Sequence, residues 1–155
     1  MIHIRKATLD DMRDISRLYY QLSRFGNGLS PDYENIYTKM QNNDAYYLMV
    51  AFDDENQVVG SVLCIVCQSL AENFESFLVI EDVIVDENNR RAGIGRALFA
   101  EVDRIAQENR CVYAILASSG YRKGAHQFYR SVGFTDDVVG FRKQFGKVSS
   151  PDSQI

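Results

Sequence analysis

Several features that define specialised protein classes are absent from this chain of 155 residues. It has no tryptophan, and its longest apolar run, "SVLCIVC" at 61–67, is much shorter than a membrane-spanning helix requires. The first residues, "MIHIRKATLDDM", lack the continuous apolar segment of a secretory signal. Three cysteines are too few for a small disulfide-built domain and suit a reducing compartment. We therefore expect a cytoplasmic protein with no membrane partner.

An excess of positive charge is also missing. Asp and Glu together number 21 against 17 Lys and Arg, which gives a net charge of -4. Broad nucleic-acid binding requires an extensive basic face, so we expect no nucleic-acid partner. The densest basic group is small and local, and it comprises Arg90, Arg91 and Arg96.

The cysteines and histidines predict no metal site. Cys64 and Cys67 form a C-x-x-C pattern, but they lie in a β-rich run, where residues three apart point to opposite faces of a sheet. The redox version of this motif opens a helix instead. Cys111 begins another apolar run and is expected to pack in the core, whereas His3 and His126 form no cluster.

Hydrophobic periodicity predicts one domain with the element order β-α-α-β-β-β-α-β-α-β. Because a strand-helix-strand crossover packs back onto its own sheet, this order implies an α/β fold with a mixed sheet and helices on both faces. Strands are expected at 2–7, 46–52, 58–66, 77–85, 111–117 and 138–145. Helices are expected after a Thr8–Asp11 capping box, after Ser30 and Pro31, from Gly93 or Ile94, and at 124–132 before Gly133.

Two segments of the second half carry further expectations. The run "CVYAILA" at 111–117 is continuously apolar and predicts a buried strand. The polar end of the chain, "GKVSSPDSQI", predicts disorder. We therefore assign the domain to residues 1–146 and expect a disordered tail at 147–155.

The segment "NNRRAGIGRALFAEVDRIA" at 88–106 places three arginines and two glycines where a strand gives way to a helix. Cations at the positive end of a helix dipole cost about 0.3–1 kcal/mol each unless an anion lies there. Glycines lack a Cβ atom, so the backbone N–H groups can close on phosphate oxygens. The segment therefore indicates either a pyrophosphate site or solvated arginines beside a tight turn. It lacks the G-K-S/T of a P-loop and the third glycine of a dinucleotide-binding fingerprint.

Three segments, taken in order, resemble the GNAT superfamily of acyl-CoA-dependent N-acyltransferases. They are "IRKATLDDM" at 4–12, "RRAGIG" at 90–95, which is similar to the R/Q-x-x-G-x-G/A signature, and "FYRSVGF" at 128–134. Arg91 and Ala92 stand where many members have glycine and lysine. The resemblance spans nearly the whole chain and implies a single GNAT-like domain with a mostly antiparallel sheet.

The resemblance also implies that acetyl-CoA is the co-substrate and that its pyrophosphate lies at the signature. Backbone groups of Val83, Ile84 and Val85 are then expected to pair with the pantetheine arm as an added strand would. The signature residues expected to bind the cofactor are Arg90, Arg91, Ala92, Gly93, Ile94, Gly95 and Arg96.

Two adjacent carboxylates are candidates for the general base. A primary amine has a pKa of about 10.4, so its acetylation at neutral pH requires a proton acceptor. Glu81 and Asp82 lie inside an otherwise apolar strand, where only one of them faces the cleft unless a bulge bends the strand. The resemblance implies that Glu81 is the base. Asp82 is expected to form a structural ion pair with a covering helix.

Tyr129 is the candidate general acid. In "GAHQFYRSVGF" it shares a helical face with Ala125, Phe128 and Val132, which is also the pattern of a core aromatic. The resemblance implies that Tyr129, within F-Y-x-x-x-G-F, directs its hydroxyl at the CoA sulfur. Phe128 is expected only to pack.

The expected acceptor is a primary amine of a small molecule. The segment "ILASSGYRKGAHQFY" at 115–129 is similar to that of small-amine acetyltransferases, including aminoalkylphosphonate acetyltransferases. Ser118, Ser119, Arg122 and Lys123 either hold an anionic group of the acceptor or decorate a surface loop. The loops at 22–28 and 67–76 are expected to build the acceptor pocket.

Other functions stay open at the level of sequence. The acceptor could be a protein lysine or N-terminus, or the chain could be a CoA-binding regulatory module without turnover. A nucleotide-binding protein is a third alternative, with incomplete motifs. Homodimers are common in the family, and the strand expected at 138–145 is a candidate interface element. The favoured mechanism is direct transfer in a ternary complex without an acylated cysteine.

Overall fold

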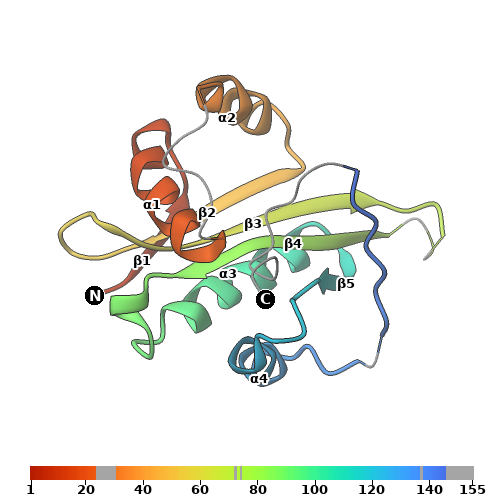
Figure 1. Ribbon diagram of the computed structural model, residues 1–155. Helices are drawn as coiled ribbons and strands as arrows, with labels where there is room; N and C mark the ends of the chain where they lie inside the picture. Colours follow the sequence, from red (N-terminus) through yellow and green to blue (C-terminus); the bar gives the residue numbers. More distant parts are fainter. Residues whose placement is uncertain (24–30, 72, 74, 137, 146–155) are drawn as a thin grey trace.

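Five strands lie side by side in chain order in the computed structural model, which describes residues 1–23, 31–71, 73, 75–136 and 138–145 (Figure 1). Neighbouring strands run antiparallel except for the last pair, which is parallel. The mixed, mostly antiparallel sheet expected from the sequence is therefore confirmed. The strands are β1 (His3–Lys6), β2 (Tyr46–Phe52), β3 (Val58–Gln68), β4 (Ser76–Val85) and β5 (Cys111–Leu116).

Helices cover both faces of the sheet, with α1 and α2 on one face and α3 and α4 on the other (Figure 1). Their bounds are α1 (Met12–Ser23), α2 (Tyr33–Gln41), α3 (Ile94–Glu108) and α4 (Lys123–Ser131), and short 3-10 turns occur at Leu9–Asp11 and Glu87–Asn89. The N-cap of α2 is Asp32, and the expected Ser30 lies outside the described residues. No helix in the described ranges has the length and apolar character needed to cross a bilayer.

Each face of the sheet has its own apolar core. Leu78 and Ile80 of β4 pack with Leu98 and neighbouring residues of α3, and all three side chains are fully buried. On the opposite face, Ile84 packs with Leu18 and the rest of the apolar stripe of α1. The apolar stripes expected for α1 and α3 are thus confirmed as core faces, whereas α2 has no fully buried residue and its Ile36 is 46% exposed.

The predicted capping box at the start of α1 is also confirmed. The backbone N–H of Thr8 donates to Asp11 Oδ2 at 2.7 Å, and the N–H of Asp11 donates to the Thr8 carbonyl at 3.1 Å. Arg5 on β1 holds the same carboxylate with two further hydrogen bonds of 2.6 and 2.9 Å. This network ties the first strand to the first helix.

β5 is an edge strand, and the expectation that it is buried is wrong. Its side chains Val112, Tyr113 and Ile115 are 50%, 46% and 41% exposed. In the described part of the chain it has a strand neighbour only on its β4 side. An apolar run alone does not distinguish a central strand from an edge strand, because the neighbour is supplied by distant residues.

The strand predicted at 138–145 is likewise not formed in the single chain, so that prediction is wrong. These residues have no regular secondary structure, and Val139 and Phe141 are 77% and 96% exposed. A strand needs a partner for its backbone hydrogen bonds, and none of the described strands adjoins this segment. The tail expected at 147–155 lies outside the described residues.

Candidate active site

The candidate site lies where β4 and β5 separate. Their parallel ladder runs from Ser76 opposite Cys111 to Ile80 opposite Leu116, where β5 ends. β4 continues to Val85, so residues 81–85 have a strand partner only on the β3 side within the described chain. One edge of Val83, Ile84 and Val85 is thus open to an extended ligand, which agrees with the backbone pairing expected for pantetheine.

The loop after β4 turns directly into α3. Gly93 is the N-cap and has φ 80°, a left-handed conformation that favours glycine, and Arg91 is also left-handed at φ 65°. The first hydrogen bond within α3 runs from the Ala97 N–H to the Gly93 carbonyl at 3.0 Å. The N–H groups of the preceding residues, Ile94 to Arg96, therefore have no helical acceptor. The start of α3 was predicted correctly from the sequence.

A cavity of about 890 Å³ lies in front of this helix end. Its walls come from β4, from the glycine-arginine loop and from α4 with the residues that precede it. It takes in every residue of the expected cofactor set except Ala92, whose side chain is exposed. The lining residues are Val83–Val85, Arg90, Arg91, Gly93–Arg96, Tyr121–Ala125, Phe128 and Tyr129.

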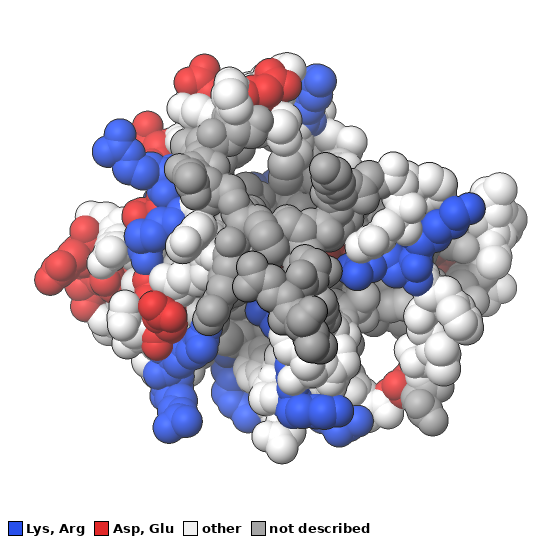
Figure 2. Space-filling model, in the orientation of Figure 1, with Lys and Arg blue, Asp and Glu red and all other residues white. Residues whose placement is uncertain are grey.

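Positive charge gathers at this cavity. Arg90, Arg91 and Arg96 form no ion pair with any carboxylate in the described residues, and Arg96 donates only to the Ser131 hydroxyl at 3.3 Å. Figure 2 shows Lys and Arg side chains on the lower part of the molecule, where Figure 1 places α4 and the start of α3. The cavity is therefore suited to an anionic ligand.

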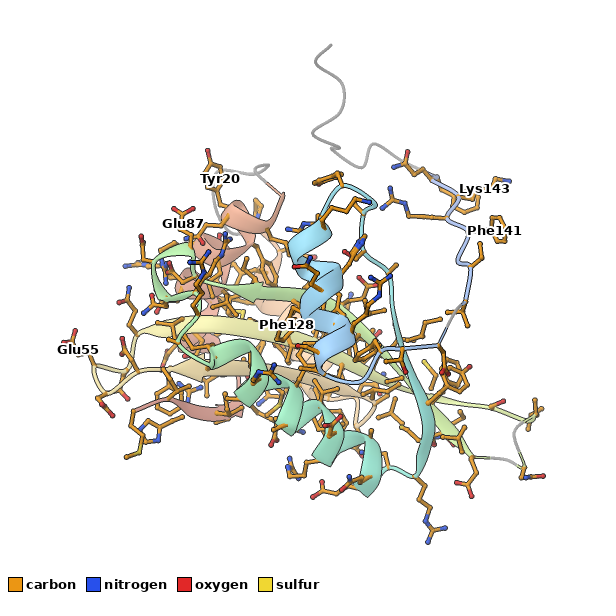
Figure 3. All side chains as sticks on the ribbon, turned by 90° about the horizontal axis from the view of Figure 1, so that it is seen from below. Tyr20, Glu55, Glu87, Phe128, Phe141 and Lys143 are labelled. Carbon is orange, nitrogen blue, oxygen red and sulfur yellow. The ribbon has the colours of Figure 1, made fainter. Side chains whose placement is uncertain are left out.

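Gly95 has a packing role in addition to the expected phosphate role. A Cβ atom at this position would lie 3.0 Å from Phe128 Cζ, closer than ordinary contact. Phe128 on α4 faces α3 and the sheet (Figure 3), and its ring meets Phe99 edge to face at 5.4 Å between centroids. Glycine at 95 thus lets α4 approach α3 and close one wall of the cavity.

A β-bulge brings Glu81 and Asp82 to the same face. The pairing with β3 shifts between Ser61 and Leu63, so β4 carries one extra residue there, and Asp82 adopts φ 52°. With strict alternation Asp82 would face α3. Instead Asp82 lies close enough to Tyr19 on α1 for its charge to raise the Tyr19 pKa. The bulge that the sequence left open is therefore present.

Both carboxylates are exposed, and neither forms an ion pair within the described residues, so the structural pair expected for Asp82 is not found among them. Burial raises the pKa of Asp82. Burial, together with the neighbouring charge of Asp82, also raises the pKa of Glu81. Such shifts bring a carboxylate closer to the range useful for accepting a proton at neutral pH.

Tyr129 on α4 lines the cavity, whereas Glu81 and Asp82 are not among its lining residues. Its half-buried ring tilts against Phe99 at 5.8 Å and Phe134 at 6.2 Å between centroids. Burial raises the pKa of its phenol, and the charge of Arg122 opposes that rise. The hydroxyl thus stays protonated at neutral pH, as a proton donor must.

The four residues expected to bind the acceptor do not all line the same cavity. Arg122 and Lys123 line the cavity that also holds the cofactor set, whereas Ser118 and Ser119 do not. The hydroxyl of Ser118 is buried and makes no hydrogen bond, and the carbonyl of Ser119 lies 3.0 Å from His126 Nε2. The expected acceptor loop at 22–28 lies largely outside the described residues.

The cysteines show no sign of a shared site. All three are free thiols, and burial raises the pKa of Cys64 to about 12, so it is not a thiolate at neutral pH. The described residues contain no group of three or more His, Cys, Asp or Glu side chains that could hold a metal ion.

A family model, the acetyltransferase (GNAT) family, matches residues 9–134. The chain belongs to this family. The fold and enzyme class that the resemblance implied are thereby confirmed.

Individual relatives are more distant. The glucosamine 6-phosphate N-acetyltransferase of Trypanosoma brucei brucei is 32% identical over 78 residues, which cover 50% of this chain and 51% of that protein. The match thus spans about half the length of that curated relative. Structures under 25% identical support the fold alone.

Two such structures illustrate the likeness. Glucosamine-6-phosphate N-acetyltransferase from Arabidopsis thaliana has a TM-score of 0.83 at 19% identity, covering 94% of this chain and 99% of that one. An aminoglycoside acetyltransferase from an uncultured soil metagenomic sample has a TM-score of 0.79 at 24% identity, covering 94% and 97%.

Sequence reasoning missed two residues near the site. Tyr19 was assigned only to the apolar stripe of α1, yet it lies beside Asp82. Gly60 on β3 was not singled out, although a Cβ atom there would lie 3.0 Å from Ile94 Cγ2. Neither has a local signal, because in each case the neighbour comes from another part of the chain.

The raised pKa of Asp82 predicts a stability change with a definite sign. The folded chain binds this proton more tightly than the unfolded chain, so stability falls as the pH rises from about 3.9 through the raised pKa. Asp82→Asn, which tolerates a positive φ, should therefore raise the urea midpoint at pH 7. The gain should shrink towards pH 4.

Asp86→Asn is the matched control. Burial opposes ionisation of Asp86, but the hydrogen bonds from Arg17 and the Asn88 N–H, together with the charge of Arg17, outweigh it and lower the pKa of Asp86. Its loss should therefore lower the urea midpoint at pH 7. An Asp82→Asn midpoint at or below that of the unchanged protein would contradict the prediction.

Proposed function

We propose that this protein transfers an acetyl group from acetyl-CoA to a primary amine of a small molecule, by direct transfer in a ternary complex. Glu81 acts as the general base and Tyr129 as the general acid. One observation carries the proposal: a single cavity is lined by Val83–Val85 at the open edge of β4, by the arginines at the start of α3 and by Tyr129 on α4.

Three features support acetyl-CoA as the donor. The helix end with unpaired arginines suits a pyrophosphate, and the open edge of Val83–Val85 suits the amide-rich pantetheine arm. The cavity runs from these arginines to Tyr129, which would lie at the thioester end. Among the expected contacts, Ala92 would contribute through its backbone.

The proton balance follows from the two residues. The amine nitrogen attacks the thioester carbonyl, the carbon-sulfur bond breaks, and the amine proton passes to Glu81 directly or through water. Tyr129 gives its proton to the departing sulfur. The proton taken by Glu81 and the one lost by Tyr129 are exchanged through solvent, so one amide and one free thiol result.

The acceptor is proposed to be a small amine. The relatives are named for glucosamine 6-phosphate and aminoglycosides, both of which carry amines on a sugar. Two unpaired carboxylates beside the β4 opening suit an acceptor that arrives as an ammonium ion. Ser118 and Ser119 stay predicted acceptor contacts, and the buried, unpaired hydroxyl of Ser118 supports this.

We further propose that residues 1–146 form the acetyltransferase domain, a span that includes the family match at 9–134. A cytoplasmic location is proposed as well, because free cysteines persist in a reducing compartment. Cell fractionation with an antibody to the protein would test the location.

The decisive assay is thiol release from acetyl-CoA across a panel of acceptors. The panel contains amino sugars, aminoglycosides, aminoalkylphosphonates, polyamines and amino acids, with lysine and N-terminal peptides for comparison. We expect release with at least one small amine. Thiol release only with peptides would show that the acceptor is a protein amine and not a small molecule. CoA binding without thiol release in the presence of any acceptor would indicate a regulatory module.

The two catalytic roles predict distinct kinetic changes. Tyr129→Phe and Glu81→Gln should each lower kcat about 10²–10⁴-fold, because each loses a proton transfer, while the KM for acetyl-CoA changes little. Arg90→Ala should mainly raise the KM for acetyl-CoA. If all three variants altered only the acetyl-CoA KM, the assigned roles would be wrong.

We also propose a homodimer formed through the C-terminal segment 138–145. This segment stands away from the sheet, and Figure 3 shows Phe141 and Lys143 on its outer course. Phe141 and Phe145 are 96% and 90% exposed, and the free edge of β5 carries exposed Tyr113. A second copy could place its segment along that edge and gain both apolar burial and a strand ladder.

Light scattering after size exclusion would test the dimer. The unchanged protein should elute as a dimer, and Phe141→Ser should shift it to a monomer. Leu70→Ser is the control, since Leu70 is similarly exposed at 87% but lies in the turn between β3 and β4. A monomeric unchanged protein would exclude this assembly.

A further inference from the structure

Arg122 is a half-buried cation that immediately precedes the first residue of α4. It lines the same cavity as Tyr129. It forms no ion pair with any carboxylate in the described part of the chain, unlike Arg5, Arg17 and Arg104. A cation in this position is also disfavoured by the positive end of the helix dipole. The cavity therefore holds a cation whose charge is balanced by no described carboxylate.

Arg122 and Tyr129 both line the cavity from the α4 side. The two residues are seven positions apart, which is about two helical turns, so they share one face of α4. Helical side chains lean towards the N-terminus, and this brings the phenol of Tyr129 back over the first turn, towards Arg122. The two groups interact electrostatically, since the charge of Arg122 counteracts the effect of burial on the phenol.

We propose that Arg122 stabilises the negative charge left on Tyr129 when the phenol gives its proton to the departing sulfur. This inference rests on the proposed function. The carbon-sulfur bond breaks, the sulfur takes the phenolic proton, and the phenolate is held beside Arg122 until a proton from solvent restores it. Arg122 acts through Tyr129 and is a positioning residue. This role differs from the acceptor contact that the sequence indicated for Arg122.

Among the described residues at this end of the cavity, no other cation is placed as well as Arg122 to offset the negative charge of the phenolate. Arg90, Arg91 and Arg96 belong to the start of α3, where the pyrophosphate is expected. Lys123 also lines the cavity, but its side chain is exposed, and an ammonium group in water contributes less to a half-buried phenolate than Arg122 does.

The test compares Arg122→Gln, Arg122→Lys and Arg130→Gln. Arg130 is the matched control because it is an exposed cation on α4, next to Tyr129 in sequence and outside the cavity. Arg122→Gln should lower kcat about 10-fold or more. Arg122→Lys should restore most of the rate, and Arg130→Gln should leave it unchanged. Circular dichroism would establish that each variant is folded.

The pH profile separates this role from a structural one. Tyr129 must be protonated to act, and loss of the Arg122 charge raises its pKa, so the high-pH decline of kcat should move to higher pH in Arg122→Gln. Arg122→Lys should return the high-pH decline of kcat towards its original pH. An unchanged kcat and pH profile in Arg122→Gln would overturn the inference.

Two further outcomes are also decisive. If Arg122→Gln keeps kcat but weakens binding of CoA more than of dephospho-CoA, the residue holds the phosphate on the ribose, and the inference is wrong. If the unchanged protein releases no thiol with any acceptor, the proposed function itself fails. Release by the unchanged protein with no effect of Arg122→Gln overturns the inference alone.

Discussion

The extra residue of β4 opposite Ser61–Leu63 is the constraint on which the site depends. Before the bulge, Leu78 and Ile80 face α3, and after it Ile84 faces α1. Asp82 absorbs the change by taking a left-handed conformation, which costs a non-glycine residue roughly 1–2 kcal/mol and aspartate less than most. The bulge allows β4 to bury apolar side chains on both faces of the sheet and still to present two adjacent carboxylates on one face.

Close helix packing complements this bulge on the other face. Gly95 and Phe128 bring the start of α3 against α4, so the helix end with free N–H groups and the wall carrying Tyr129 enclose one cavity. The glycines of the signature therefore have two different purposes. Gly93 supplies a left-handed turn with nothing near its missing Cβ, and Gly95 supplies contact between helices.

Charges without partners mark the two sides of the site. The described chain leaves Glu81 and Asp82 unpaired on one face, and arginines unpaired on the other. Some of the described charges away from the site are paired, as in the bidentate contact of Arg5 with Asp11. Unpaired groups cost stability in the isolated protein and are relieved by a cationic acceptor and an anionic donor. The separation of charge thus matches the two substrates of the proposed reaction.

Local pattern was sufficient for most elements and for the family. The strand β2, the capping box before α1 and the glycine turn before α3 depend on residues close together in the chain, and all three were predicted correctly. Tyr129 and Arg90 could be nominated for the same reason, since each belongs to a short motif. Their roles remain predictions.

Contacts between distant segments decided the rest. The exposure of β5 and the missing strand at 138–145 follow from which strands find neighbours, and the apolar runs themselves do not contain that information. The shared face of Glu81 and Asp82 arises from the register with β3, and the cavity that joins Tyr129 to the arginines arises where α4 packs on α3. Local sequence was enough to predict the four helices, five of the six expected strands and the candidate chemistry. The tertiary structure alone decided which charges lie together, because burial and pairing are properties of packed segments.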